Sequence, residues 1–176
     1  MKVILCLCFF LTLQNPMILF NFNAQSELRN WVIVDDVVMG GRSTGSFSLT
    51  PEGHGLFKGR VSLENNGGFS SVRHRFASKQ VGEFTKVKLR VKGDGKSYQF
   101  RLRSSTRDSH AYVATFKTNS AWSTVKIPFA AMYPSFRGQK LKLPNYPGQS
   151  MEEIAFLIVY KTAETFAMEI DRIELE

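Results

Sequence analysis

From Trp31 onward, apolar and polar residues alternate along short stretches of the chain. In segment 86–92, Val87, Leu89 and Val91 fall between lysine and arginine residues, and segments 56–64 and 97–103 repeat this period of two. A period of two places alternate side chains on opposite faces of a strand, so each segment is predicted to be a half-buried strand. Seven further segments have strand character, namely 31–34, 45–49, 69–76, 111–117, 122–127, 153–160 and 166–175.

Turn residues separate these predicted strands. Glycine, asparagine and proline gather at 50–53, 65–68, 92–95 and 144–148, where chain reversals need their backbone conformations. Asp94-Gly95 is expected to close a hairpin between 86–92 and 97–103, and the unbroken apolar run 154–160 predicts a central strand covered on both faces. One short turn near 130–133 is the only helical signal, and 137–149 is the one long loop. The pattern predicts an all-β fold, either a two-sheet sandwich of jelly-roll type or a barrel.

The first 24 residues differ from the rest of the chain. Lys2 precedes an apolar run at 3–13, a second apolar patch spans 17–22, and Ala24 offers a small residue for cleavage. This layout predicts a signal peptide over 1–24 and a mature domain over 25–176. Phe22 and Pro16 fit the pattern less well, which leaves an uncleaved anchor as the alternative. The predicted location is exported: periplasmic, secreted or envelope-associated.

Cysteine content and net charge restrict the chemistry of the predicted domain. Cys6 and Cys8 are the only cysteines and both lie in the predicted leader. The mature domain would therefore contain no disulfide, thiolate nucleophile or cysteine metal ligand. Its length suits one ordinary domain. The net charge of +8 on the 176 residues favours anionic partners.

Two glycine-rich loops are the first candidate binding elements. The first contributes Asp36, Met39, Gly40 and Gly41, and the second contributes Asn65, Asn66, Gly67 and Gly68. The favoured interpretation of both loops is structural, with Asp36 capping loop amides and the glycines adopting conformations closed to other residues. The functional interpretation is that the loop backbone approaches a ligand.

A basic sheet face is the second candidate. Alternation places Lys86, Lys88, Arg90 and Lys92 on one face of a strand, with Arg101 and Arg103 on the like face of its expected hairpin partner and Arg73 and Arg75 together on another strand. Such a face could meet an acidic protein, an anionic glycan or lipid headgroups at a membrane surface. Its alternative is a solvated outer face. Nucleic acid is not predicted as a partner, because no stacking aromatics alternate with these charges.

Catalytic chemistry finds little support in the sequence. His54 lies in a turn and His74 is expected to face the core, while the adjacent residues of Asp108-Ser109-His110 cannot form a relay that distant segments normally assemble. Asp35 and Asp36 point apart as neighbours on a strand end, and a calcium-binding role for one of them stays open. No phosphate-binding loop is present. We therefore predict no catalytic residue, no metal site and no cofactor.

Several sequence motifs occur in an order that resembles a known family. They are Trp31, Asp35-Asp36, Met39-Gly40-Gly41, Ser43, Phe57-Lys58-Gly59, the run 63–69, Ser71-Val72-Arg73, the run 91–95, Tyr98, Trp122, Ile127-Pro128-Phe129, Phe136-Arg137-Gly138 and 166–173. Together they resemble the NADH:ubiquinone oxidoreductase complex I intermediate-associated protein 30 family over nearly all of the mature chain. The predicted export segment stands where mitochondrial members carry a transit peptide, which suggests an exported, bacterial-type member.

The resemblance implies a galactose-binding-like jelly-roll sandwich. It also implies a role like that of the mitochondrial members, which are assembly factors that bind and stabilise intermediates of respiratory complex I without known catalysis. We therefore expect a non-catalytic binding domain with an unidentified protein partner, of assembly-factor or chaperone-like type. The alternative is a carbohydrate-binding module, which would need exposed aromatics such as Trp122, Tyr133 or Tyr146 to stack on sugar rings.

Overall fold

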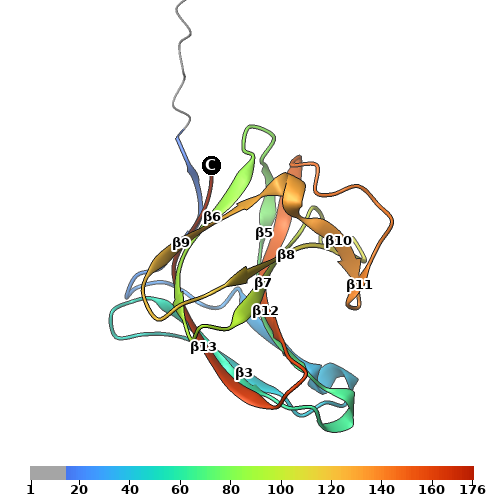
Figure 1. The fold of residues 1–176 in the computed structure, drawn as a ribbon. Coiled ribbons are helices and arrows are strands. Elements are labelled where there is room, and N and C mark those ends of the chain that lie inside the picture. The colour runs from blue at the N-terminus through green and yellow to red at the C-terminus, as the bar shows by residue number, and fades with distance from the viewer. Residues whose placement is uncertain (1–14) are drawn as a thin grey trace, which may run out of the picture.

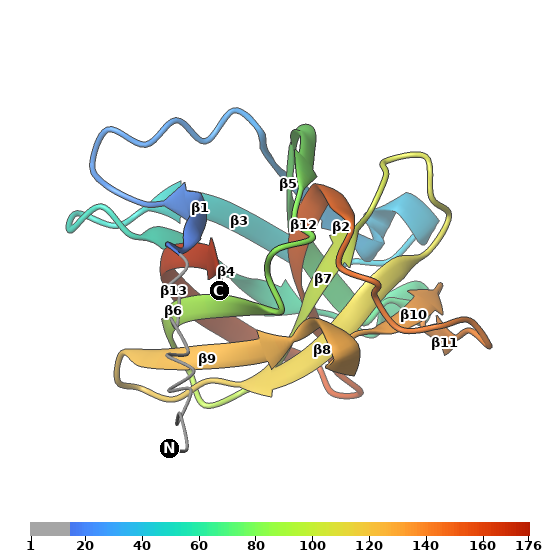
Figure 2. The same cartoon turned by 90° about the horizontal axis from the view of Figure 1, so that it is seen from above.

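The structure is a computed structural model that describes residues 15–176 (Figure 1). In this part of the chain, thirteen strands form two antiparallel sheets that pack face to face, and three short 3-10 helices lie in the connections. Figure 2 shows the two sheets on opposite sides of the molecule. The fold is the two-sheet sandwich expected from the sequence.

The first sheet has the strand order β3-β4-β13-β6-β9, with β1 paired to β13 outside this path. Its strands are β1 (Met17–Asn21), β3 (Thr44–Leu49), β4 (Gly55–Val61), β6 (Lys86–Gly93), β9 (Ser123–Pro128) and β13 (Glu164–Leu175). The long strand β13 is central, because β4 pairs along one part of its length and β6 runs along its other edge.

The second sheet has the order β11-β10-β8-β7-β12-β5-β2. Its strands are β2 (Trp31–Asp35), β5 (Phe69–Gln80), β7 (Ser97–Arg103), β8 (Ala111–Lys117), β10 (Tyr133–Phe136), β11 (Gln139–Lys140) and β12 (Ser150–Val159). The 3-10 helices are η1 (Asp36–Met39), η2 (Glu64–Asn66) and η3 (Phe129–Ala131). All ten strands expected from the sequence are present, and β1, β10 and β11 are additional.

The core lies between the sheets and is built from the apolar sets that alternation predicts. Val87, Leu89 and Val91 of β6 are completely buried, and Tyr98 and Phe100 of β7 face them from the other sheet. His74 is also buried as expected, stacked on Trp31 with ring centroids 4.6 Å apart. On these two strands the residues between these positions, which include Lys88 and Arg101, point outward.

The expected hairpin at Asp94-Gly95 is wrong. β6 pairs with β13 and β9, whereas β7 pairs with β8 and β12, so the turn carries the chain from one sheet to the other. The Asp94 carboxylate accepts a hydrogen bond from the Ala167 amide of β13 at 2.9 Å, which ties this crossover to the first sheet. A single basic face that joins β6 to β7 therefore does not exist.

The strand expected to be covered on both faces is buried on both over residues 154–158, although only one of these faces lies in the core. Ile154, Phe156 and Ile158 of β12 point into the core, but Ala155 and Leu157 face away from it. Neighbouring side chains bury these two residues without a further layer above them. The apolar run therefore reflects a central strand whose outer face forms the floor of a cleft.

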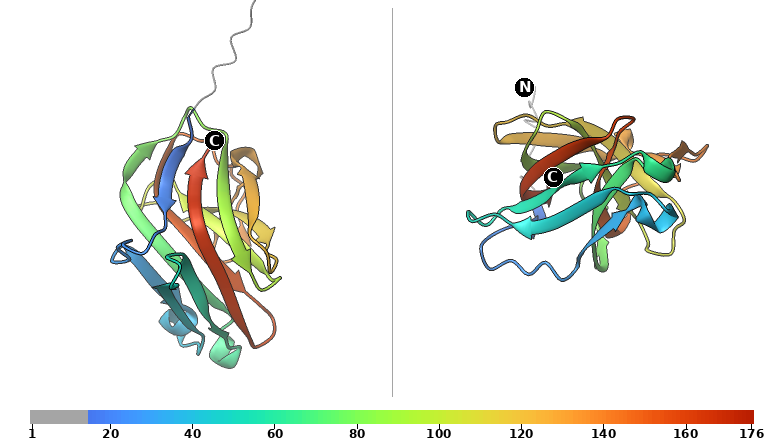
Figure 3. Two further views of the ribbon diagram at one scale, coloured as in Figure 1. Left: turned by 90° about the vertical axis from the view of Figure 1, so that its left-hand side faces the viewer. Right: turned by 90° about the horizontal axis from the view of Figure 1, so that it is seen from below.

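The sandwich begins ahead of the boundary predicted between residues 24 and 25. β1 pairs with residues 172–175 of β13, and Figure 3 shows it beside the C-terminal end of the chain. Leu19 and Phe22 belong to the buried core, where Phe22 packs against Trp31. Residues 1–14 of the predicted leader lie outside the described residues, and cleavage after Ala24 stays a prediction.

Candidate functional site

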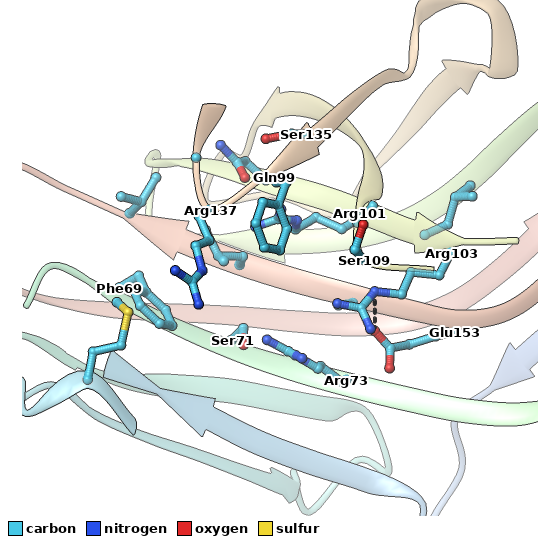
Figure 4. Close-up of a pocket in the computed structure, with 18 residues that line it drawn as sticks. Phe69, Ser71, Arg73, Gln99, Arg101, Arg103, Ser109, Ser135, Arg137 and Glu153 are labelled. Atoms are coloured by element: carbon cyan, nitrogen blue, oxygen red, sulfur yellow. Dashed lines mark ion pairs between the residues drawn. The ribbon is translucent and has the colours of Figure 1, made fainter. Parts of the chain in front are cut away.

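A cleft of about 470 Å³ opens on the outer face of the second sheet (Figure 4). Its floor and walls come from β5, β7, β8, β12 and the β10–β11 hairpin. Strand pairing places two polar rows across this floor. Glu153 of β12 lies opposite Arg75 of β5 and Arg103 of β7, and two residues further along β12, Ala155 lies between Arg73 and Arg101.

The single carboxylate that lines the cleft is already paired with arginines. Glu153 is 4% exposed, and its carboxylate lies 2.7 Å from Nε of Arg75 and 3.6 Å from Nε of Arg103. Burying a carboxylate is costly unless it is paired, and the two arginines around Glu153 supply that pairing. Glu153 is therefore engaged with its own sheet and is a poor candidate for acid or base catalysis.

Arg73 and Arg101 have no such partner. Among residues 15–176, neither guanidinium takes part in a hydrogen bond or ion pair. Burial lowers the pKa of the Arg101 guanidinium, and the positive charges of Arg73 and Arg103 lower it further. Burial likewise lowers the pKa of Arg73, an effect that Glu153 partly offsets. Both stay charged at neutral pH, so the cleft holds positive charge that the protein itself does not neutralise.

A further arginine reaches the cleft from the tip of the β10–β11 hairpin. Arg137 and Gly138 form its two-residue turn with φ of 48° and 78°, the backbone that type I′ turns require. An arginine there costs roughly 1 kcal/mol relative to glycine. Its guanidinium lies 5.3 Å from the centre of the Phe136 ring, and Figure 4 shows it pointing into the same space as Arg73 and Arg101.

The basic residues of β6 behave differently, and Arg90 is not part of the cleft. Each of the four is paired with a carboxylate of β13 or its C-terminal end: Lys86 with Glu176, Lys88 with Glu174, Arg90 with Asp171 and Lys92 with Glu169. Arg90 also lies over the Trp122 ring, 5.5 Å from its centre. The charge of this face is balanced across the strands. Arg90 lies outside the cleft and its role as a binding residue stays a prediction, whereas Arg73, Arg101 and Arg103 line the cleft.

The two glycine-rich loops are held together by Asp36. This carboxylate is fully buried and accepts hydrogen bonds from the amides of Ser43 (2.9 Å), Gly68 (2.7 Å) and Phe69 (3.2 Å), and from the Ser43 hydroxyl. Burial alone would raise the pKa of Asp36, but these donors outweigh it and hold the pKa below its usual 3.8. Asp36 is thus the cap that the structural interpretation expected, and it is closed to ligands.

The glycines of the two loops leave room for the Asp36 carboxylate. A Cβ on Gly41 or Gly67 would lie 2.3 or 2.6 Å from an Asp36 carboxylate oxygen, so neither position admits a larger residue without displacement. The Asn65 side chain donates to the Gly40 carbonyl at 3.1 Å. Asn65, Asn66, Gly40 and Gly68 all adopt positive φ. Of the eight loop candidates, Met39 is the one that lines the cleft.

Apolar residues gather at the end of the cleft next to the two loops that Asp36 connects. Met39 of η1 is 64% exposed, Val159 at the end of β12 is 52% exposed and Phe136 is 41% exposed. Phe69 lies beside them on β5. We call these four residues the apolar rim. The cleft therefore combines uncompensated arginines along its floor with exposed apolar side chains at one end.

The described residues contain neither a metal-binding cluster nor a long apolar helix. Between residues 15 and 176, no three histidine, cysteine or acidic side chains gather to bind a metal ion. No helix in this part of the chain has the length and apolar character to cross a membrane. The Asp108 carboxylate accepts from the Ser105 amide within its own turn, so it does not orient His110.

The aromatics expected to form a sugar platform do not meet in the cleft. Tyr146 is 4% exposed and donates its hydroxyl to the Ser150 carbonyl at 2.7 Å. Trp122 packs against His54 with centroids 4.6 Å apart, and Lys140 lies over Tyr133. None of the three lines the cleft. Its aromatic residues are Phe69 and Phe136, which local patterning did not single out.

Solved structures with the same fold are carbohydrate-binding modules and related domains. The family 11 module of the cellulase Lic26A-Cel5E of Clostridium thermocellum superposes with a TM-score of 0.66 at 15% identity, covering 92% of this chain and 94% of that one. The agarase AgWH50C gives 0.60 at 10% identity, covering 93% of this chain and 25% of that one. At these identities the likeness shows the fold alone.

Sequence comparison leads to a different group of proteins. The protein named "Complex I intermediate-associated protein 30, mitochondrial" of Drosophila melanogaster is 25% identical over 184 residues, and that of Mus musculus is 22% identical over 185. Each alignment covers 90% of this chain, which spans 62% of the fly relative and 56% of the mouse relative. A family model matches residues 20–170. The chain therefore belongs to the Complex I intermediate-associated protein 30 family.

Proposed function

We propose that this chain is a non-catalytic protein-binding domain of assembly-factor type, and that it holds its partner in the arginine-lined cleft. The observation that carries the proposal is the pair Arg73 and Arg101, which face a solvent-open cleft without any carboxylate partner of their own. A protein seldom leaves charges half-buried and unpaired unless a ligand completes them. The family supports a protein as that ligand, since its fly and mouse members are named for association with complex I intermediates.

The same cleft offers little to a chemical reaction. Its one carboxylate, Glu153, is held by Arg75 and Arg103, and hydrolysis of glycosidic bonds normally needs two carboxyl groups flanking the bond. Ser109 lines the cleft, but Asp108 is bonded to its own turn and leaves no oriented relay beside it. Binding is the function that these groups can perform.

Carbohydrate binding is the second candidate. It is favoured by the superposition on the family 11 module and by Phe69 and Phe136 in the cleft. Against it, the Arg137 guanidinium lies over the Phe136 ring, and Trp122, Tyr133 and Tyr146 all lie outside the cleft. Sugar-binding platforms rely on aromatic faces that are open to the ligand.

Affinity capture tests the proposal. The purified protein would be incubated with a detergent extract of the cells that produce it, in parallel with Arg101→Glu and with Arg90→Glu as the matched control. Arg90→Glu makes the same charge reversal on the first sheet, away from the cleft. We expect a reproducible partner that Arg101→Glu loses and Arg90→Glu retains. Equal recovery by all three proteins would contradict the role of the cleft, and specific binding on a glycan array without a captured protein would favour the second candidate.

Export of the chain is likewise proposed from the charge and hydropathy of its first residues. N-terminal sequencing of the protein isolated from cells tests it. A chain that begins at Gln25 would support cleavage after Ala24. That product would lack β1, so a start ahead of Met17 would instead agree with the complete sheet.

A further inference from the structure

The cleft contains more positive charge than its own carboxylate can balance. The residues that line it include only one carboxylate, that of Glu153, but four arginines: Arg73, Arg101, Arg103 and Arg137. Arg75 outside the cleft takes a share of that carboxylate as well. On β6, by contrast, every basic residue has an acidic partner on β13 or just past its C-terminal end. The excess in the cleft is therefore a local property, and an anionic ligand would complement it.

The positive charge is focused at one position on the floor. Arg73 and Arg101 stand on opposite sides of Ala155 in strand register, and the small alanine side chain between them adds little bulk. Guanidinium groups bind carboxylates through two parallel hydrogen bonds. One carboxylate above Ala155 could accept bonds from both arginines. This position, defined by Arg73, Ala155 and Arg101, is called the carboxylate seat.

The separation between the carboxylate seat and the apolar rim follows from the residue spacing along β12. Val159 belongs to the rim and stands four residues along β12 from Ala155, so the two positions are about 13 Å apart at roughly 3.3 Å per residue. An extended peptide covers the same distance in four residues. It also directs residues i and i+4 to the same side, so one face of a bound strand could present an acidic and an apolar side chain to the two positions.

Arg137 closes the space between the seat and the rim. The hairpin tip presents its side chain there although φ of 48° would suit glycine better, and backbone strain of this kind tends to persist at functional positions. The guanidinium covers one face of the Phe136 ring and keeps its own donors directed into the cleft (Figure 4). The Gln99 amide also lines this stretch, where a peptide main chain would offer partners for it.

We propose that the cleft binds an extended, acidic peptide segment of the partner protein, with an Asp or Glu side chain in the carboxylate seat and an apolar side chain four residues away on the rim. This inference rests on the proposed function and specifies the ligand of the same site. Aliphatic residues such as Met39 and Val159 suit an apolar amino-acid side chain, whereas a sugar ring needs open aromatic faces. An anionic glycan such as polygalacturonate is therefore the competing outcome of the test.

A displayed library of random dodecapeptides, selected on the purified full chain, tests the inference. We expect enriched sequences to share an acidic residue and an apolar residue at a spacing of four. A synthetic peptide of that sequence should bind at least tenfold more tightly than its version with Asn or Gln in place of the acid, because a charge-assisted pair is lost. Arg73→Ala and Arg101→Ala should each reduce binding to the same extent, and Arg90→Ala should leave it unchanged.

Arg137→Gly provides a variant that keeps the fold while it removes a cleft guanidinium, since glycine favours the φ found there. We expect weaker peptide binding from this stably folded variant. Enriched peptides without an acidic residue, or binding of polygalacturonate with no peptide selected, would overturn the inference. If cellular capture still yields a partner lost on Arg101→Glu, the proposed function stands and only the peptide inference fails. Failure of both experiments would reject both proposals.

Discussion

Replacing Asp36 with alanine should be among the most destabilising single changes in this domain. The carboxylate is fully buried and accepts hydrogen bonds from three backbone amides, those of Ser43, Gly68 and Phe69. The Ser43 hydroxyl can turn to the Ser62 carbonyl at 3.3 Å, but the three amides would lose their acceptor. Each buried unsatisfied donor costs about 1–3 kcal/mol. Allowing for water that enters the vacated space, we expect a loss of about 3–5 kcal/mol.

This loss can be measured by urea unfolding at pH 7, followed by tryptophan fluorescence, because Trp31 is buried and becomes exposed on unfolding. Typical domains have a total unfolding free energy of about 5–15 kcal/mol, so the variant should unfold at a much lower urea concentration. Asp36→Asn is the matched control. It keeps the shape and one acceptor oxygen, and it should lose about half as much. A loss below about 1 kcal/mol for Asp36→Ala would refute the view that this carboxylate joins the two loops.

The same carboxylate predicts how stability depends on acid. The folded pKa of Asp36 lies below its usual 3.8, so its stabilising contribution is fully present above that pH and is lost as the pH falls through the folded pKa. The wild-type protein should lose stability below pH 4 more steeply than Asp36→Ala. Parallel slopes for the two proteins in urea titrations between pH 5 and 2.5 would contradict the assignment.

Three further predictions address other parts of the fold. Burial lowers the pKa of His74 below its usual 6.5, so its contribution is present above 6.5 and declines as the pH falls through the lowered value; urea titrations from pH 7 to 5 should show this decline in the wild type and a flatter profile in His74→Phe. Arg137→Gly should raise the unfolding free energy by about 0.5–1 kcal/mol, because glycine relieves the strain of a positive φ; a lower midpoint in the same assay would argue against that strain. A chain that begins at Gln25 should be about 3–6 kcal/mol less stable than one that begins at Asn15, since it loses the buried side chains of Leu19 and Phe22. Equal thermal midpoints for these two chains would show that β1 contributes little.

The candidate site shows where sequence reasoning stopped. Arg73, Arg101 and Arg103 were identifiable as outward residues of alternating strands, and all three line the cleft. Arg90 has the same pattern and is neutralised by Asp171. The difference lies in the neighbouring strand, which alternation within one strand cannot reveal. Arg137 was overlooked as a binding residue, although an arginine before glycine in a two-residue turn is an unusual choice that could have marked it.

The sequence alone determined ten of the thirteen strands and which of their side chains are buried, because the period of two is a local property of each strand. It also indicated that Asp36 caps loop amides, because the glycines near it signal a tight loop. Only the tertiary structure decided that Asp94-Gly95 crosses between sheets, that β1 belongs to the sandwich and that Gly68 reaches Asp36 from 32 residues away. The tertiary structure likewise placed the unpaired Arg73 and Arg101 on either side of Ala155. Strand pairing joins residues that are distant in sequence, so both the cleft and its charge depend on contacts that no local pattern contains.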